Sequence, residues 1–164
     1  MTIHRSVAAA VFAVVALVSI SGTAQGDPGP AATQTLQTAS YPLFVVDDSG
    51  VTGQLQIVAT AGGGTHLVLT VQGLTEGESY AAAVYVGSCG PDRSLRLELE
   101  PIGRENDPFV SITESTFTFE EFTDGDHFVY VFDGDTIDRP DVEGLEVVAL
   151  ACGEVGLGAL EGQP

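Results

Sequence analysis

Short runs in which apolar and polar residues alternate cover most of the chain after residue 40, and they constrain the fold more than any other feature. Residues 66–71, for example, read HLVLTV. A repeat of two places neighbouring side chains on opposite faces of a β-strand, whereas an amphipathic helix repeats about every 3.6 residues. Runs of this kind follow one another about every ten residues, with glycine- and aspartate-rich turns between them. They lie at 41–46, 51–60, 66–71, 80–86, 95–99, 117–119, 127–132 and 145–151. This spacing predicts one all-β domain at residues 41–160, a β-sandwich or barrel without a helix.

The N-terminal residues have the three-part layout of a secretory signal peptide. A positive charge at Arg5 precedes an apolar run at 7–20, and small residues follow as far as Ala24. The apolar run is too short to span a bilayer comfortably. We therefore predict that residues 1–24 are removed on export, with a retained anchor helix as the alternative. Residues 25–40 are small and polar and are expected to form a flexible leader. The expected location is secreted or extracytoplasmic, with no membrane span after cleavage.

The charge of the chain restricts its partners. It contains 23 acidic and five basic residues, and its net charge is −18. Lysine is absent. Such a surface repels nucleic acid and anionic lipid, so neither is an expected partner, whereas an unidentified protein or cell-surface partner is. High salt would screen the self-repulsion, so the composition fits a halophilic source as well as an ordinary acidic secreted protein.

Two cysteines, Cys89 and Cys152, occur in this exported chain. An even number of cysteines in an oxidising compartment is typical of a disulfide. Because the Cys-x-x-Cys spacing is absent, neither a zinc ribbon nor a redox pair is expected.

Three segments occur in a recognisable order. They are VTGQLQ at 51–56, GLTEG at 73–77 followed by the 80–90 stretch that ends in SCG, and LACGEVG at 150–156. Together they resemble the copper/zinc superoxide dismutase superfamily and its relatives, the chordin-type (CHRD) domains of secreted proteins, over about residues 50–158. The resemblance implies a Greek-key β-barrel, with an immunoglobulin-like sandwich as the alternative. It also implies that Cys89 and Cys152 form the disulfide that joins a loop to the last strand.

The resemblance does not include the family's copper site. In the family, two copper-binding histidines stand two residues apart on the strand that follows the Gly-Leu-Thr-x-Gly turn. The two possible alignments place these positions at Ala83 and Tyr85, or at Ala82 and Val84. A further copper-binding histidine corresponds to Val131 or Phe132. Methyl groups cannot ligate copper, and a tyrosine is a poor substitute for a pair of nitrogen ligands.

Two further family features are missing. Residues 91–94 lead directly into the 95–99 run, which leaves no room for the long zinc-binding loop, and the arginine that guides the anionic substrate corresponds to Ala149. We therefore expect neither copper nor zinc, and no catalytic residue. The leading hypothesis is a non-catalytic extracellular binding or structural module. The alternative is a divergent metal-binding protein or superoxide dismutase with non-standard ligands.

Two acidic segments contain side chains that could bind a divalent cation. The candidates are Asp124, Asp126 and His127 in one segment, and Asp133, Asp135 and Asp138 in the other. The second segment is an oxygen-rich loop of a kind that can hold calcium, although its spacing departs from the EF-hand. For the first segment we favour an exposed histidine at the start of a strand, and for the second a solvated acidic loop.

Aromatic residues recur at period two in the 127–132 run, HFVYVF. If Tyr130 and Tyr85 both faced outward, they would form a small apolar patch for a partner. Cross-strand packing that stabilises the sheet is the favoured interpretation.

Overall fold

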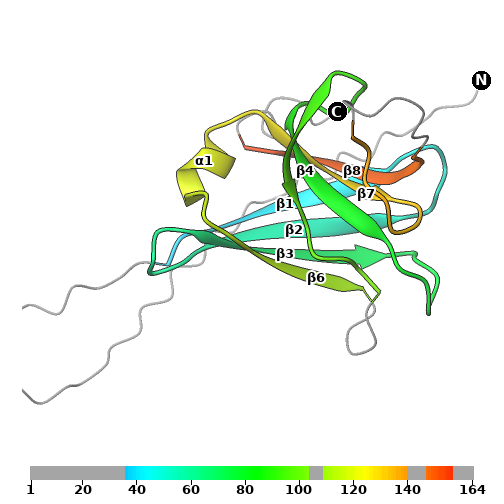
Figure 1. Cartoon of the computed structure of the whole chain (residues 1–164), viewed down its shortest axis with the longest axis horizontal. Coiled ribbons are helices and arrows are strands. Elements are labelled where there is room, and N and C mark those ends of the chain that lie inside the picture. Colours follow the sequence, from blue (N-terminus) through cyan, green and yellow to red (C-terminus); the bar gives the residue numbers. More distant parts are fainter. Residues whose placement is uncertain (1–35, 104–108, 140–146, 157–164) are drawn as a thin grey trace, which may run out of the picture.

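A computed structural model describes residues 36–103, 109–139 and 147–156. These residues form one curled antiparallel sheet of eight strands, a half-barrel, and one short helix (Figure 1). The elements are β1 (Thr38–Val45), β2 (Thr52–Ala59), β3 (Thr65–Gln72), β4 (Ala81–Gly87), β5 (Arg93–Glu98), β6 (Val110–Ser115), α1 (Phe119–Thr123), β7 (His127–Phe132) and β8 (Ala149–Val155). The all-β prediction is confirmed. None of the described helices is both long and apolar enough to cross a membrane.

The strand order in the sheet is β5-β4-β7-β8-β1-β2-β3-β6. Strand β1 joins the two halves, because Thr38 to Leu43 pair with β2 whereas Phe44 and Val45 pair with β8. Two pairings, β3 with β6 and β4 with β7, connect strands that are distant in sequence. The sheet therefore brings the C-terminal strands between β4 and β1.

The main hydrophobic core fills the inside of the half-barrel. In β3, Thr65, Leu67, Leu69 and Val71 are buried and alternate with more exposed residues, as the period of two predicts. The opposite wall contributes buried aliphatic side chains from β4 and β7. They are Ala82, Val84, Val129 and Val131.

Strands β5 and β6 are the two ends of the sheet order, and side chains connect them where backbone pairing does not. The amide N–H of Glu100 donates to Thr113 Oγ1 over 2.8 Å, and the hydroxyl of Ser111 donates to the Glu100 carbonyl oxygen. Nearby, the Arg96 guanidinium carbon lies 3.7 Å from the centroid of the Phe117 ring. Polar and cation–π contacts thus link the two edges.

Helix α1 was not expected, and the prediction of a strand at 117–119 is wrong. Thr118 is the N-cap of the helix and forms a capping box with Glu121: each side chain accepts a hydrogen bond from the other's backbone N–H. Phe122, from the same aromatic-rich segment, is buried in the main core. The alternating aromatic residues of FTFEEF therefore predicted a strand, whereas the capping box at its centre begins a helix.

Other boundaries also differ. Strand β6 was missed, because its inward residues Ser111 and Thr113 are polar and the apolar Ile112 faces outward, which inverts the usual pattern. Strand β1 begins at Thr38, so three residues of the predicted leader belong to the sheet. Strand β8 runs from Ala149 to Val155, later than the predicted 145–151. The predicted signal peptide, the first part of the leader and residues 145–146 lie outside the described residues.

Candidate functional site

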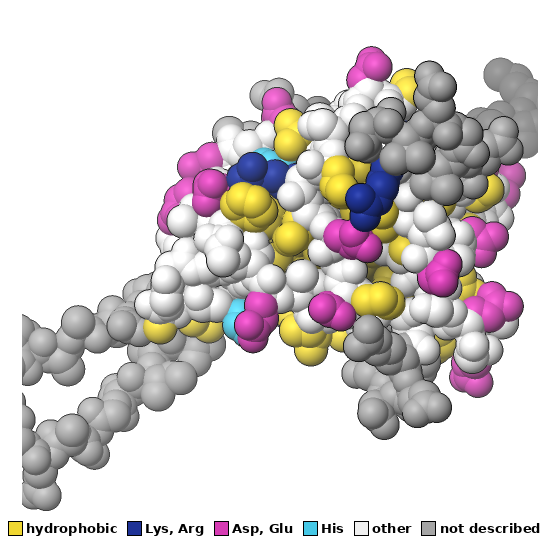
Figure 2. Space-filling model, in the orientation of Figure 1, with side chains coloured by type: hydrophobic (Ala, Val, Ile, Leu, Met, Phe, Trp, Pro, Cys, Tyr) yellow, Lys and Arg dark blue, Asp and Glu magenta, His cyan; other side chains and the backbone are white. Residues whose placement is uncertain are grey.

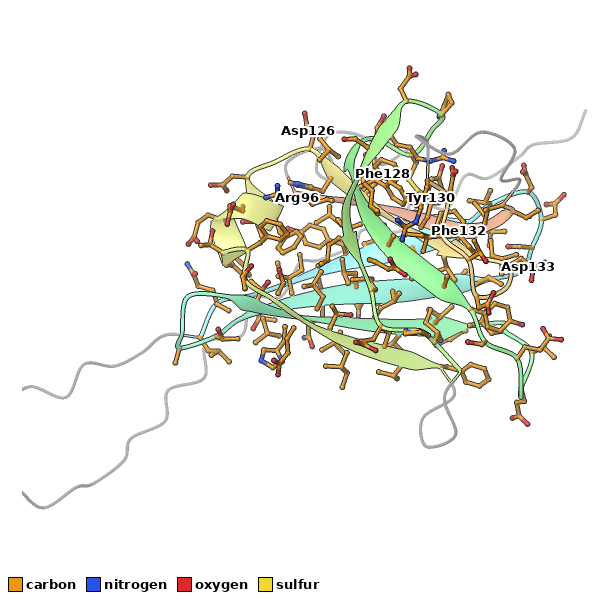
Figure 3. The ribbon with its side chains drawn as sticks, in the orientation of Figure 1. Arg96, Asp126, Phe128, Tyr130, Phe132 and Asp133 are labelled. Carbon is orange, nitrogen blue, oxygen red and sulfur yellow. A yellow bond between two sulfur atoms is a disulfide. The ribbon has the colours of Figure 1, made fainter. Side chains whose placement is uncertain are left out.

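The outer sides of β4 and β7 carry a second buried cluster, which we call the outer aromatic cluster: Tyr85, Phe128, Tyr130 and Phe132. Tyr85 stacks on Phe128 with ring centroids 5.4 Å apart and meets Tyr130 edge-on at 6.1 Å. Phe128, Tyr130 and Phe132 follow one another along β7 on one side of the strand (Figure 3). All six residues of β7 are buried, because this cluster covers one face and the main core covers the other. The favoured interpretation of Tyr85 and Tyr130 as packed residues is confirmed.

The loop after β7 covers the outer aromatic cluster. Ile137 is buried against it, and the Tyr85 hydroxyl donates to the Asp138 carbonyl oxygen over 2.6 Å. The Arg93 guanidinium lies over Tyr130, 5.2 Å from the ring centroid, and forms an ion pair with the Asp138 carboxylate. Burial raises the pKa of Tyr85 to about 12, although the charge of Arg93 opposes the shift. The cover is therefore held by a hydrogen bond, an ion pair and a cation–π contact.

The disulfide expected from the cysteine count is present between Cys89 and Cys152, which are 63 residues apart. Cys152 lies in β8 and packs against the outer aromatic cluster, while Cys89 lies in the turn between β4 and β5. The bridge fixes this turn to β8. It is also consistent with an oxidising, extracytoplasmic setting.

His127 is not the exposed histidine that the sequence favoured, because only 7 % of it is accessible. Helix α1 lies against it, with the Phe122 ring centroid 5.8 Å from the imidazole. Burial lowers the pKa of His127, the charge of Arg96 lowers it further, and backbone groups of Gly125 together with Asp126 act in the opposite direction. The fold therefore favours a neutral imidazole at this position.

An open cleft of about 210 Å³ lies beside His127 and the disulfide turn, lined by Gly87, Ser88, Asp126, His127 and Glu154. Its carboxylates and hydroxyl would favour a ligand that donates hydrogen bonds or carries positive charge. No local pattern in the sequence indicates this cleft, because the pairing of β7 with β4 and β8 brings its residues together from distant parts of the chain.

The candidate metal ligands do not converge. Within the described ranges, no group of three or more histidine, cysteine, aspartate or glutamate side chains is placed to hold a metal ion. Asp124 and Asp126 are exposed next to the buried His127. In the following loop, Asp138 pairs with Arg93, whereas Asp133 and Asp135 are exposed. Acidic side chains are in general spread over the visible surface rather than gathered in one patch (Figure 2).

The positions that the resemblance assigns to copper ligands are occupied by packed side chains in either alignment. Ala83 and Tyr85 belong to the outer cluster and its surroundings, whereas Ala82 and Val84 lie in the main core. No imidazole lies at any of these positions, and the one polar atom, the Tyr85 hydroxyl, already donates to a carbonyl oxygen. These residues do not fit copper or zinc.

Comparisons of the chain with protein-family models, with curated proteins and with solved structures found no match.

Proposed function

We propose that the chain is an exported, non-catalytic module of the superoxide dismutase-like and CHRD-like type, which serves outside the cell in binding or as a structural unit. The observation that carries the proposal is the outer aromatic cluster. In the alignment that places the expected ligand pair at Ala83 and Tyr85, Tyr85 of this cluster is buried and stacked on Phe128. In the other alignment the pair falls on Ala82 and Val84, which are buried in the main core. A redox metal site needs converging nitrogen ligands and access for substrate, and a covered aromatic core provides neither.

The strand order supports the finer fold assignment, a Greek-key barrel opened between β5 and β6. In a Greek key, consecutive strands form hairpins and a long connection then places the next strand beside one that is distant in sequence. The pairings of β3 with β6 and of β4 with β7 are of this kind. The position of the disulfide, between a turn and the last long strand, agrees with what the resemblance implies.

The proposal is tested by the metal content and superoxide turnover of the exported protein, secreted into medium that contains copper and zinc and purified without reductant. Washing in high salt removes cations that bind loosely to the acidic surface. We expect substoichiometric copper and zinc and no turnover above that of buffer. One copper or zinc ion per chain would refute the proposal and support a divergent metalloprotein. In that case Asp126→Asn and Glu154→Gln variants would show whether the cleft holds the ion.

A further inference from the structure

Strand β6 ends the sheet and leaves one side of its backbone without a partner strand among the described residues (Figure 1). The Val71 N–H donates to the Phe109 carbonyl oxygen over 2.9 Å. Hydrogen-bonded pairs alternate along an antiparallel ladder, so Ser111 and Thr113 also point their backbone groups toward β3. The residues between them, including Ile112, therefore direct their N–H and C=O groups to the open edge.

Strand β6 itself lacks several of the features that usually prevent strands from pairing between molecules. Natural edges are protected by charged side chains, above all lysine, by proline, by a β-bulge or by a covering segment. The only charged residue of β6 is Glu114. The chain has no lysine, β6 has no proline, and its pairing with β3 shows no register shift. Ile112, at the middle of the strand, is 58 % exposed.

The edge also lies in the part of the sheet with the fewest charges. Strands β1, β2, β3 and β6 together contain one charged residue, Glu114, whereas the other four strands contain two glutamates and two arginines. Glu114 stands directly opposite His66 on β3. Two copies of a chain with a net charge of −18 repel each other over most of their surfaces, so they approach most easily through such a region.

We propose that β6 pairs antiparallel with β6 of a second copy, about a twofold axis at Ile112. The proposal is independent of the proposed function. In this register Ile112 faces Ile112 of the second copy, and the two residues exchange backbone hydrogen bonds. Val110 faces Glu114 of the second copy. The two Glu114 side chains are then four residues apart along the ladder, about 14 Å, which exceeds the Debye length of about 10 Å in 0.1 M salt.

A second copy suits this edge better than an unrelated strand does. A twofold axis makes the strand complementary to itself, with the apolar centre buried and the acidic ends apart. A single strand pair buries less than the roughly 1,600 Å² of a standard interface, so the dimer is expected to be weak. Because salt screens the repulsion between the acidic bodies, its affinity is expected to rise with ionic strength.

Sedimentation equilibrium of the exported, disulfide-bonded protein in low and high sodium chloride tests the proposal. We expect a monomer–dimer equilibrium that strengthens with salt. Ile112→Glu places like charges opposite each other and should weaken the dimer at least about tenfold. Val148→Glu is the matched control, because Val148 is 61 % exposed and lies outside β6, and it should dimerise like the wild type.

Ile112→Pro provides a second variant. The Ile112 N–H does not contribute to the β3–β6 ladder, so proline preserves the monomer's hydrogen bonds while it blocks the edge. It should also abolish dimerisation. The proposal is overturned by a wild-type protein that stays monomeric in high salt at submillimolar concentration. It is equally overturned if both Ile112 variants dimerise unchanged, or if Val148→Glu weakens the dimer as much as Ile112→Glu does.

Discussion

Replacement of Tyr85 measures whether the outer aromatic cluster is part of the folded core. Tyr85→Phe keeps the ring and removes the hydroxyl that donates to the Asp138 carbonyl oxygen, a hydrogen bond worth about 1 kcal/mol. Tyr85→Ala also removes a fully buried ring, and deletion of a buried aromatic side chain destabilises by about 3–5 kcal/mol. We therefore expect a loss of about 4–6 kcal/mol for the alanine variant, a large part of the roughly 5–15 kcal/mol that stabilises a typical domain.

Urea denaturation with the disulfide intact provides the assay. The dependence on urea should be similar in all variants, and the midpoints should fall in the order wild type, Tyr85→Phe, Tyr85→Ala. Phe44→Ala is the control, because Phe44 is an aromatic strand residue that is 55 % exposed, and we expect a loss of less than about 1 kcal/mol. If Tyr85→Ala lost no more stability than Phe44→Ala, the cluster would be loosely packed and open to a ligand, and the reasoning would be wrong.

Three further predictions concern the backbone and two titrating groups. Gly156 and Gly63 share a φ of +88°, but a Cβ at Gly156 would collide with the Gly125 carbonyl oxygen, whereas a Cβ at Gly63 would meet nothing. In the same urea assay, Gly63→Ala should therefore lose about 1–2 kcal/mol of stability because of the backbone angle alone. Gly156→Ala should lose at least about 2 kcal/mol more because of the collision. The pKa of His127 is lowered in the folded state, so its contribution to stability is complete above the unfolded pKa of about 6.5 and is lost as the pH falls below that value. The urea midpoint should therefore drop between pH 7 and pH 5.5. An imidazole of His127 that titrates normally by NMR would contradict this prediction. The pKa of Tyr85 is raised to about 12, so its contribution to stability is present below pH 10 and is lost as the pH rises toward 12. Tyr85→Phe should therefore lose less stability at alkaline pH than the wild type does.

Period-two alternation was sufficient to predict the strands whose core face is apolar, such as β3 with Leu67 and Leu69. It failed for β6, where Ser111 and Thr113 face inward because they bond to Glu100 on the opposite edge. These two hydrogen bonds join parts of the chain whose proximity depends on the curl of the sheet, so no local pattern could reveal them. Helix α1, in contrast, carried a readable signal in the Thr118 and Glu121 capping box.

The sequence was sufficient to predict which side chains the candidate site lacks, but not how the rest of the chain packs over it. The absence of histidine at Ala83 and Tyr85 was visible in the sequence. The cover over these residues was not visible, since Arg93 and Asp138 meet only after β5 and the loop after β7 fold onto the same face. The same long-range packing explains why His127, which appeared to be an exposed residue in an acidic turn, is buried beneath α1.

The central proposal is that packed side chains fill the positions at which the resemblance expects copper ligands. The most direct measurement is the urea midpoint of the disulfide-bonded protein with and without excess copper, zinc or calcium, at one high ionic strength. A cation that binds the native state at a hundred times its dissociation constant would stabilise the protein by about 2.7 kcal/mol. The packed cluster predicts no change in the midpoint with copper or zinc. Among the described residues of the acidic loop, Asp138 is paired with Arg93 and the exposed Asp133 and Asp135 do not converge with it on a metal site, which predicts no change with calcium. A rise of that size with copper or zinc would contradict the proposal.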